Sequence, residues 1–191
     1  MTKDELIYYA EINKFSNYHE FYDWISERED FKKFVEVGVW KGQGVVHLAN
    51  ALIDRGRDDF EIIAVDLFED LWKYKDYEKK YEGYKVKDIH KMFEYNTRPV
   101  KDYITKVKGY SDKVADKYED ESIDFVFIDA DHEQEQVRAD ILAWLPKVRK
   151  GGIISGHDYV ASQQGVIKAV NSIWRKDRKF YKGYVWYRNI D

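Results

Sequence analysis

Short apolar runs alternate with amphipathic stretches along most of this chain. Five runs have the length of buried strands and lie at residues 34–39, 61–68, 103–109, 123–130 and 151–158. Between them, apolar residues recur at the spacing of one helix face over residues 44–56, 111–120 and 135–148. Near-continuous apolar strands separated by helices are typical of a parallel sheet that is covered on both faces. The pattern therefore predicts a doubly wound α/β fold with a mostly parallel sheet.

Both ends of the chain add elements to this sheet. Helical spacing predicts two N-terminal helices within residues 1–30, at about 4–14 and 18–29. Near the other end, residues 163–177 read as a further helix. Residues 179–190 read as two strands joined by a tight Lys-Gly turn. These two strands would complete a seven-stranded sheet with an antiparallel edge strand.

One segment does not fit the alternation. Residues 69–100 are charged, partly helical and too long for a simple connection between elements. The chain has neither an internal repeat nor a Pro/Gly/Ser-rich linker, and 191 residues is the size of one ordinary domain. We therefore predict a single domain over residues 1–191, with residues 69–100 as an insertion near the substrate pocket.

Composition and charge narrow the class of partner. Lys+Arg number 32 against Asp+Glu 36, which gives a net charge of -4 and no basic footprint for nucleic acid. Without cysteine, no disulfide, thiol nucleophile or Cys-based zinc site is possible. The charged N-terminus does not resemble a signal peptide, and no apolar run reaches the roughly 18 residues of a membrane span. We expect a cytoplasmic protein that binds a small molecule; the sequence is compatible with a homodimer.

The first glycine turn indicates a nucleotide-like ligand. The stretch FVEVGVWKGQG places Gly38, Gly42 and Gly44 between a buried strand and the start of a helix. Small residues there let a ligand approach the backbone, and the helix N-terminus offers free N–H groups. Glu36, near the end of the same strand, would repel a pyrophosphate and suits the cationic amine of a ligand.

The same glycine spacing also occurs in short-chain dehydrogenases. That alternative needs a Tyr-x3-Lys pair after a later strand of the sheet. Such a pair, Tyr81 and Lys85, lies in the insertion after the second strand, which is the wrong place for it. The position of this pair, together with Glu36, argues against a dinucleotide cofactor.

Two further polar residues follow the next strands. Asp66 ends the second strand, where a carboxylate can accept hydrogen bonds from both hydroxyls of a ribose. Ser111 follows the third strand, where an adenine edge would lie. An amine, a ribose and an adenine without a pyrophosphate describe S-adenosylmethionine. The alternative is a glycine turn that only closes the fold, with acidic residues on the surface.

Carboxylates and histidines cluster after the fourth and fifth strands. The stretch IDFVFIDADHEQE places Asp129, Asp131 and His132 together, and GGIISGHDY ends in His157 and Asp158. Both groups lie at carboxyl ends of neighbouring strands, so they can converge on a divalent ion. Oxygen ligands favour Mg²⁺ or Mn²⁺, while imidazole leaves Zn²⁺, Fe²⁺ and Ni²⁺ open. The alternative is a solvated acidic loop in which His132 caps the following helix.

Taken together, these motifs resemble the class I S-adenosylmethionine-dependent methyltransferases, and specifically the small O-methyltransferases of the catechol, caffeoyl-CoA and macrocin kind. The resemblance covers about residues 31–175, and its most specific segment is IDFVFIDADHEQEQVRADILAWLPKVRKGGIISGHDY. It implies a Rossmann-like fold and the cofactor-binding positions Glu36, Gly38, Gly42, Gly44, Asp66, Leu67, Ser111 and Asp129.

The resemblance also implies roles for the second cluster. Metal-dependent members take their ligands from positions that match Asp129, His157 and Asp158. His157 departs from the usual Asp-Asp or Asp-Asn pair, which weakens the assignment of Mg²⁺. His132 matches the position of a catalytic lysine and Asp131 that of a proposed aspartate base. We favour His132 as the catalytic base because imidazole titrates closer to neutral pH.

The expected function is S-adenosylmethionine-dependent O-methylation of a small hydroxylated acceptor such as a sugar, a phenol or a natural-product intermediate. A hydroxyl is a poor nucleophile until a metal lowers its pKa or a base removes its proton. Two alternatives stay open. The cephalosporin-hydroxylase-like proteins resemble this chain in the same FIDADH and GHDY segments and would carry out metal-dependent oxidation. A non-catalytic protein could instead retain only the S-adenosylmethionine pocket.

Overall fold

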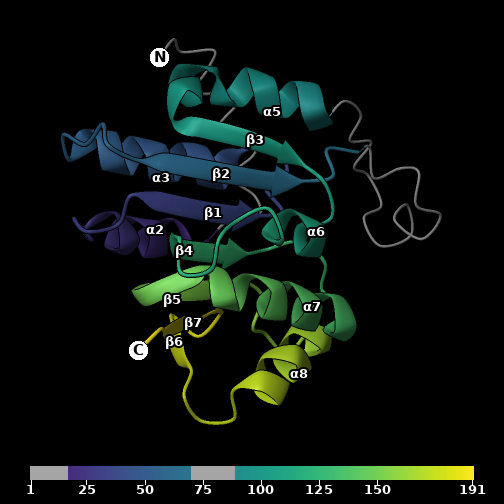
Figure 1. The fold of residues 1–191 in the computed structure, drawn as a ribbon. Coiled ribbons are helices and arrows are strands. Elements are labelled where there is room, and N and C mark those ends of the chain that lie inside the picture. The colour runs from purple at the N-terminus through teal and green to yellow at the C-terminus, as the bar shows by residue number, and fades with distance from the viewer. Residues whose placement is uncertain (1–16, 70–88) are drawn as a thin grey trace.

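The structure, a computed structural model, describes residues 17–69 and 89–191. Its centre is one seven-stranded sheet with the strand order β3-β2-β1-β4-β5-β7-β6 (Figure 1). The strands are β1 Lys33–Val37, β2 Glu61–Asp66, β3 Ile104–Lys108, β4 Ile123–Ile128, β5 Val148–Gly156, β6 Lys179–Tyr181 and β7 Val185–Asn189. Strands β1 to β5 pair in parallel, while β7 pairs antiparallel with β5 and with β6. The predicted α/β fold, with its mostly parallel sheet, is confirmed.

Helices cover both faces of this sheet. The described helices are α2 His19–Ser26, α3 Gln43–Asp54, α5 Ile89–Thr97, α6 Ser111–Ala115, α7 Gln134–Trp144 and α8 Gln164–Ile173, with short 3-10 helices η2 Arg98–Tyr103 and η3 Leu145–Lys147. One core lies between the sheet and α2, α3 and α5, and a second lies between the sheet and α6, α7 and α8.

Strand periodicity divides side chains between the two cores. Successive residues of a strand point to opposite faces, so Phe125 and Phe127 pack in the first core, whereas Val126 and Ile128 pack in the second. Strand β4 is buried throughout because it lies at the centre of the sheet. Glu36 is two residues after Phe34, which belongs to the first core, so its side chain points to the same face of the sheet. This face is covered by α2 and α3.

The crossovers put the carboxyl ends of the parallel strands on one edge of the sheet (Figure 1). Strand order reverses between β1 and β4, which are neighbours in the sheet although β2 and β3 lie between them in the sequence. A ligand crevice is expected at such a switch point, beyond the strand ends. The ends of β1, β2, β4 and β5 and the segments that directly follow them contain all but one of the predicted site residues, and Ser111 begins α6 after β3.

Some expected elements differ in extent from those observed, and others lie outside the described residues. The helix predicted over 111–120 ends at Ala115, and the fifth strand begins three residues earlier than expected, at Val148. The helix predicted over 4–14 lies outside the described residues, as do Tyr81 and Lys85. Of the predicted insertion, the described C-terminal end forms α5 and the first half of η2. No helix in the described ranges has the length and apolar character needed to cross a membrane.

Candidate active site

Gly38 joins the two halves of the site. It follows β1, adopts a φ of 85° and donates its N–H to the Val65 carbonyl at 2.8 Å. A Cβ atom on Gly38 would lie 2.1 Å from the backbone oxygen of Asp129. The missing side chain therefore allows the loop after β1 to pack directly on the loop after β4. This contact brings the predicted cofactor turn beside the predicted metal cluster.

The other two glycines open the start of α3. Gly42 precedes this helix with a φ of 87°, a conformation that favours glycine. Gly44 lies in the first turn, and a Cβ on it would stand 2.5 Å from Oε1 of Glu36. Gly44 thus leaves room for the carboxyl group of Glu36 beneath the helix N-terminus.

Glu36 is a buried acid with one identified donor. Its residue is only 2% exposed, and the Tyr22 hydroxyl of α2 donates a hydrogen bond to Oε2 at 2.8 Å. Burial raises the pKa of Glu36 to about 8, and Asp129 and Asp66 add to the rise, while the Tyr22 bond opposes it. Glu36 therefore retains its proton near pH 7 in the ligand-free protein. A cation placed beside it would favour the ionised form.

Asp66 ties the loops after β1 and β2 together. Its carboxylate accepts the backbone N–H of Trp40 at 2.9 Å and that of Phe68 at 2.8 Å. Both of these residues have a positive φ, 48° and 49°. Burial raises the pKa of Asp66, and the backbone hydrogen bonds oppose that rise. A carboxylate offers about four lone pairs, so Asp66 keeps acceptor capacity for a ribose diol. Leu67, half-buried, follows it directly.

Ser111 is the first residue of α6 and is buried. Its hydroxyl oxygen accepts a hydrogen bond from the Trp144 indole N–H of α7 at 2.8 Å. The hydroxyl therefore helps to join α6 to α7. Its assignment to the adenine edge stays a prediction.

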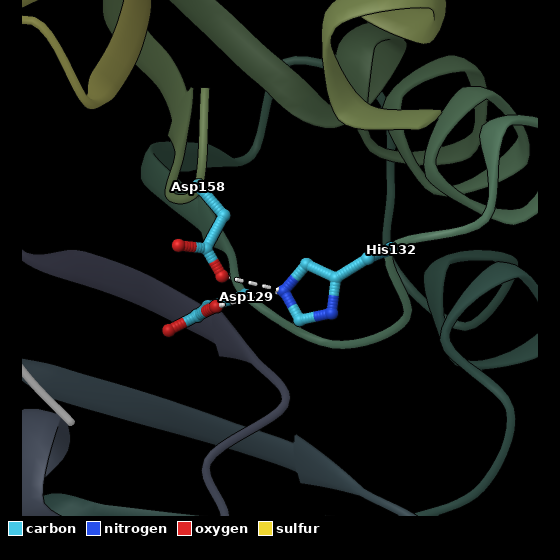
Figure 2. A group of neighbouring side chains, drawn as sticks. All are labelled: Asp129, His132 and Asp158. Carbon is cyan, nitrogen blue, oxygen red and sulfur yellow. Dashed lines mark ion pairs between the residues drawn. The ribbon is translucent and has the colours of Figure 1, made fainter. Parts of the chain in front are cut away.

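Asp129, His132 and Asp158 converge at the carboxyl ends of β4 and β5. Figure 2 shows the three side chains reaching one point from the end of β4, from the loop before α7 and from the end of β5. Nε2 of His132 lies 2.7 Å from Oδ2 of Asp158 and 3.9 Å from Oδ1 of Asp129. One potential ligand atom from each residue falls within 4.8 Å of the others. This spacing and donor set fit a divalent ion.

The charges in this cluster are strongly coupled. Burial raises the pKa of Asp129, and Asp158 adds to the rise. Although burial would raise it, the pKa of Asp158 is held well below its usual range by hydrogen bonds with His132 and His157. For His157 the effect of burial has the opposite sign, because burial would lower the pKa of an imidazole. Asp158 and Asp129 instead raise the pKa of His157. Opposite charges thus stabilise one another in a site where each alone would be costly.

His157 and Asp131 lie at the margins of the three-residue cluster. The predicted ligand set contained His157, whereas the described residues with closely spaced ligand atoms contain His132 in its place. His157 is nevertheless adjacent, since its Nδ1 lies 3.1 Å from Oδ1 of Asp158 and 3.9 Å from Oδ1 of Asp129. The Asp131 carboxylate accepts the Glu133 N–H at 2.8 Å, just before α7. A role for Asp131 as base stays a prediction.

Three residues near the site carried no signal that the sequence analysis used. Tyr22 lies within the helix predicted at 18–29, but its hydroxyl reaches Glu36 only when α2 packs on the sheet. Asn17 contacts His157 across 140 positions of sequence. Gly165, in the first turn of α8, has no room for a Cβ, which would lie 2.1 Å from the His132 carbonyl oxygen. A polar aromatic residue on a predicted helix could have marked Tyr22, but nothing local marks the other two.

Comparison with known proteins identifies the family to which the chain is similar. Residues 35–159 match a family described as methyltransferase domain, a range that runs from β1 to the residue after Asp158. No curated protein matches the chain in sequence.

Solved structures share the fold at low identity. The O-methyltransferase NovP has a TM-score of 0.71 and 15% identity, over 90% of this chain and 78% of that chain. An O-methyltransferase from Bacillus cereus in complex with SAH has a TM-score of 0.66 and 16% identity, over 97% and 88% of the two chains. The O-methyltransferase TomG from Streptomyces achromogenes, in complex with SAM, has a TM-score of 0.63 and 13% identity, over 91% and 79%.

Proposed function

This chain belongs to the methyltransferase-domain family, and from that premise we propose that it transfers the methyl group of S-adenosylmethionine to a hydroxyl of a small acceptor, with help from a divalent ion. The acceptor class is a phenol, a sugar or a natural-product intermediate. NovP and TomG, which share the fold, are both O-methyltransferases.

One observation carries the proposal: the packing of Gly38 on Asp129. It puts the turn that would bind the amine and the ribose directly beside the acid and histidine cluster. Asp129 also raises the pKa of Glu36, so the two carboxyl groups are close enough to interact electrostatically. A cofactor whose amine meets Glu36 would thus lie next to the residues that handle the acceptor hydroxyl.

On the cofactor side, this chain supplies binding and orientation. Glu36 would pair with the ammonium group, and Asp66 would accept hydrogen bonds from the ribose. S-adenosylmethionine, when bound, supplies an electrophilic methyl group. Glu36 lies under the start of α3 and is held by Tyr22, so the position of the ammonium group is fixed by two helices. Such fixed geometry is what an in-line displacement requires.

On the acceptor side, Asp129 and Asp158 would hold a divalent ion, together with one histidine. The ion, when bound, lowers the pKa of the acceptor hydroxyl. His132 would take the hydroxyl proton. The Asp158 carboxylate beside its Nε2 would stabilise the positive charge that the ring gains. The loop between β4 and α7 places this ring at the edge of the cluster rather than in the core (Figure 2).

A transfer assay tests the proposal. Purified protein is incubated with methyl-labelled S-adenosylmethionine and a panel of catechols, phenols and sugars, with Mn²⁺ or Mg²⁺ and after treatment with a chelator. We expect products that have gained one methyl group, with the rate lost on chelation and restored by the ion. His132→Ala should lower the rate while cofactor binding persists.

Other outcomes select the alternatives. A product that has gained one oxygen atom would identify metal-dependent oxidation. Cofactor binding without any product would leave a binding protein. Full transfer after chelation would remove the ion from the mechanism and leave proton removal to His132 or Asp131.

A further inference from the structure

The ring of His157 lies between Asn17 and the acid cluster. It follows β5 and is only 7% exposed. Its Nε2 lies 2.6 Å from the side-chain oxygen of Asn17, and its Nδ1 lies 3.1 Å from Oδ1 of Asp158. The two ring nitrogens therefore face two different groups, one neutral and one acidic.

The Asn17 oxygen decides which nitrogen of the neutral ring is free. An amide oxygen only accepts hydrogen bonds, so Nε2 must carry a hydrogen to donate to it. Without an ion, Nδ1 can donate its own hydrogen to Asp158. When an ion takes the place of that hydrogen, the bond from Nε2 to Asn17 is kept, and the lone pair of Nδ1 points toward the two carboxylates that would share the ion. Histidines that bind metals are commonly oriented in this way, with the second ring N–H donated to a nearby oxygen.

Asn17 and the ring are both held in place by aromatic residues. The Tyr184 hydroxyl, from the turn between β6 and β7, donates to the backbone oxygen of Asn17 at 2.8 Å. The rings of Tyr18 and Tyr184 contact the His157 ring edge to face, with centroids 5.1 Å and 5.8 Å away. The orientation of His157 is thus fixed by two segments that are distant in sequence, before any ion arrives.

The distances around Nδ1 fit coordination positions. In an octahedral site with ligand bonds of about 2.1 Å, neighbouring ligand atoms are about 3 Å apart and opposite ones about 4.2 Å apart. Nδ1 lies 3.1 Å from the Asp158 oxygen, the separation of neighbours. It lies 3.9 Å from the Asp129 oxygen, between the two values. Neither separation exceeds the largest distance between two ligand atoms of one such ion.

We propose that Asn17 is a positioning residue that presents Nδ1 of His157 to a divalent ion shared with Asp129 and Asp158. This inference rests on the proposed function only in taking this cluster as the ion site. The proposal gives the two histidines different roles. His157 would bind the ion, and His132 would accept the proton of the acceptor hydroxyl. One imidazole and two carboxylates favour a borderline ion such as Mn²⁺ over Mg²⁺, which prefers oxygen ligands alone.

Manganese affinity of the intact protein tests the role of Asn17. The dissociation constant for Mn²⁺ is measured at fixed pH by calorimetry for wild type, Asn17→Ala and Asn17→Asp. Loss of a group that orients a metal ligand typically costs 10-fold to 100-fold in affinity, and we expect that loss for Asn17→Ala. Asn17→Asp keeps an oxygen that accepts from Nε2, so it should bind Mn²⁺ at least as tightly as wild type. The matched control is Asn189→Ala, an exposed site where β7 pairs with Ile153 in the middle of β5.

Pulsed electron paramagnetic resonance of bound Mn²⁺ identifies the histidine ligand directly. We expect the nitrogen coupling of one imidazole in wild type, its loss in His157→Ala and its persistence in His132→Ala. The reverse pattern in the two histidine variants would overturn the proposal. So would wild-type Mn²⁺ affinity in Asn17→Ala, or an Asn17→Asp variant as weak as Asn17→Ala. These measurements need no methyl transfer, so failure of the transfer assay would leave them interpretable.

Discussion

At the scale of single residues, Glu36 shows how burial changes the chemistry of an acid. Its carboxyl group lies on the face of β1 covered by two helices, with Tyr22 as an identified hydrogen-bond donor. The pKa of Glu36 lies near 8, so the folded protein holds this proton more tightly than the unfolded chain does. Stability from this group is therefore present below its unfolded pKa and is lost as the pH rises toward 8.

We predict that Glu36→Gln gains stability relative to wild type as the pH rises from 5 to 9. The amide has nearly the same shape and does not ionise, so the variant avoids the cost of a buried charge. A pKa rise from 4.5 to about 8 corresponds to roughly 5 kcal/mol as an upper limit. Urea unfolding of both proteins across this pH range measures the difference. A difference in unfolding free energy that does not change with pH would show that Glu36 titrates as it does in the unfolded chain.

At the scale of elements, the start of α8 packs against the loop that carries His132. Gly165 lies in the first turn of this helix, and its Cα faces the backbone of His132 and Gln134. The two helices α7 and α8 pack side by side in the second core (Figure 1). The loop that carries His132 is thus seated between the end of β4 and α8.

We predict that Gly165→Ala lowers methyl transfer much more than it lowers cofactor affinity. In an exposed helix, replacing glycine by alanine stabilises by about 1 kcal/mol. Here the new methyl group would stand 2.1 Å from the His132 carbonyl oxygen, so backbone must move, at a cost of about 1 to 3 kcal/mol. Transfer rate, S-adenosylmethionine affinity and urea unfolding are compared with Ser162→Ala, an exposed change just before α8. A more stable variant with wild-type transfer would show that the loop is not held in this way.

At the scale of the whole molecule, the proposed ligand site combines residues from distant parts of the chain. Asp66 joins the loops after β1 and β2, Tyr22 of α2 covers Glu36, and Asn17 reaches the end of β5. These residues are in place only when both cores are formed. A ligand that binds the folded crevice and not the unfolded chain must therefore stabilise the fold.

We predict that S-adenosylmethionine at about 100 times its dissociation constant stabilises the protein by roughly 2.7 kcal/mol. For a domain of this size, this corresponds to a rise in melting temperature of about 5 to 10 °C. The same concentration should give Asp66→Ala a smaller rise, because the ribose loses a charged acceptor worth about 2 kcal/mol. Asp58→Ala, exposed before the opposite end of β2, is the matched control and should respond as wild type does. An equal rise in all three proteins would remove Asp66 from the cofactor site.

The sequence by itself determined the layout of the sheet. Apolar runs of strand length separated by helical spacing permit few arrangements, and parallel crossovers of fixed hand then place the carboxyl end of every parallel strand on one edge. The sites at the ends of β1, β2, β4 and β5 follow from this, because a residue at the end of a parallel strand has a predictable place. Glu36, Asp66, Asp129 and Asp158 could be selected for that reason.

Tertiary structure alone decided which groups meet around those positions. The contacts of Asn17 with His157 and of Tyr22 with Glu36 join segments 140 and 14 positions apart, and neither follows from local periodicity. The engagement of Ser111 by Trp144 depends on how α6 packs against α7. The grouping of His132 with the two aspartates depends on a loop seated against Gly165. Backbone pattern specifies where strands end, whereas side-chain contacts between elements depend on packing in three dimensions, which periodicity does not encode.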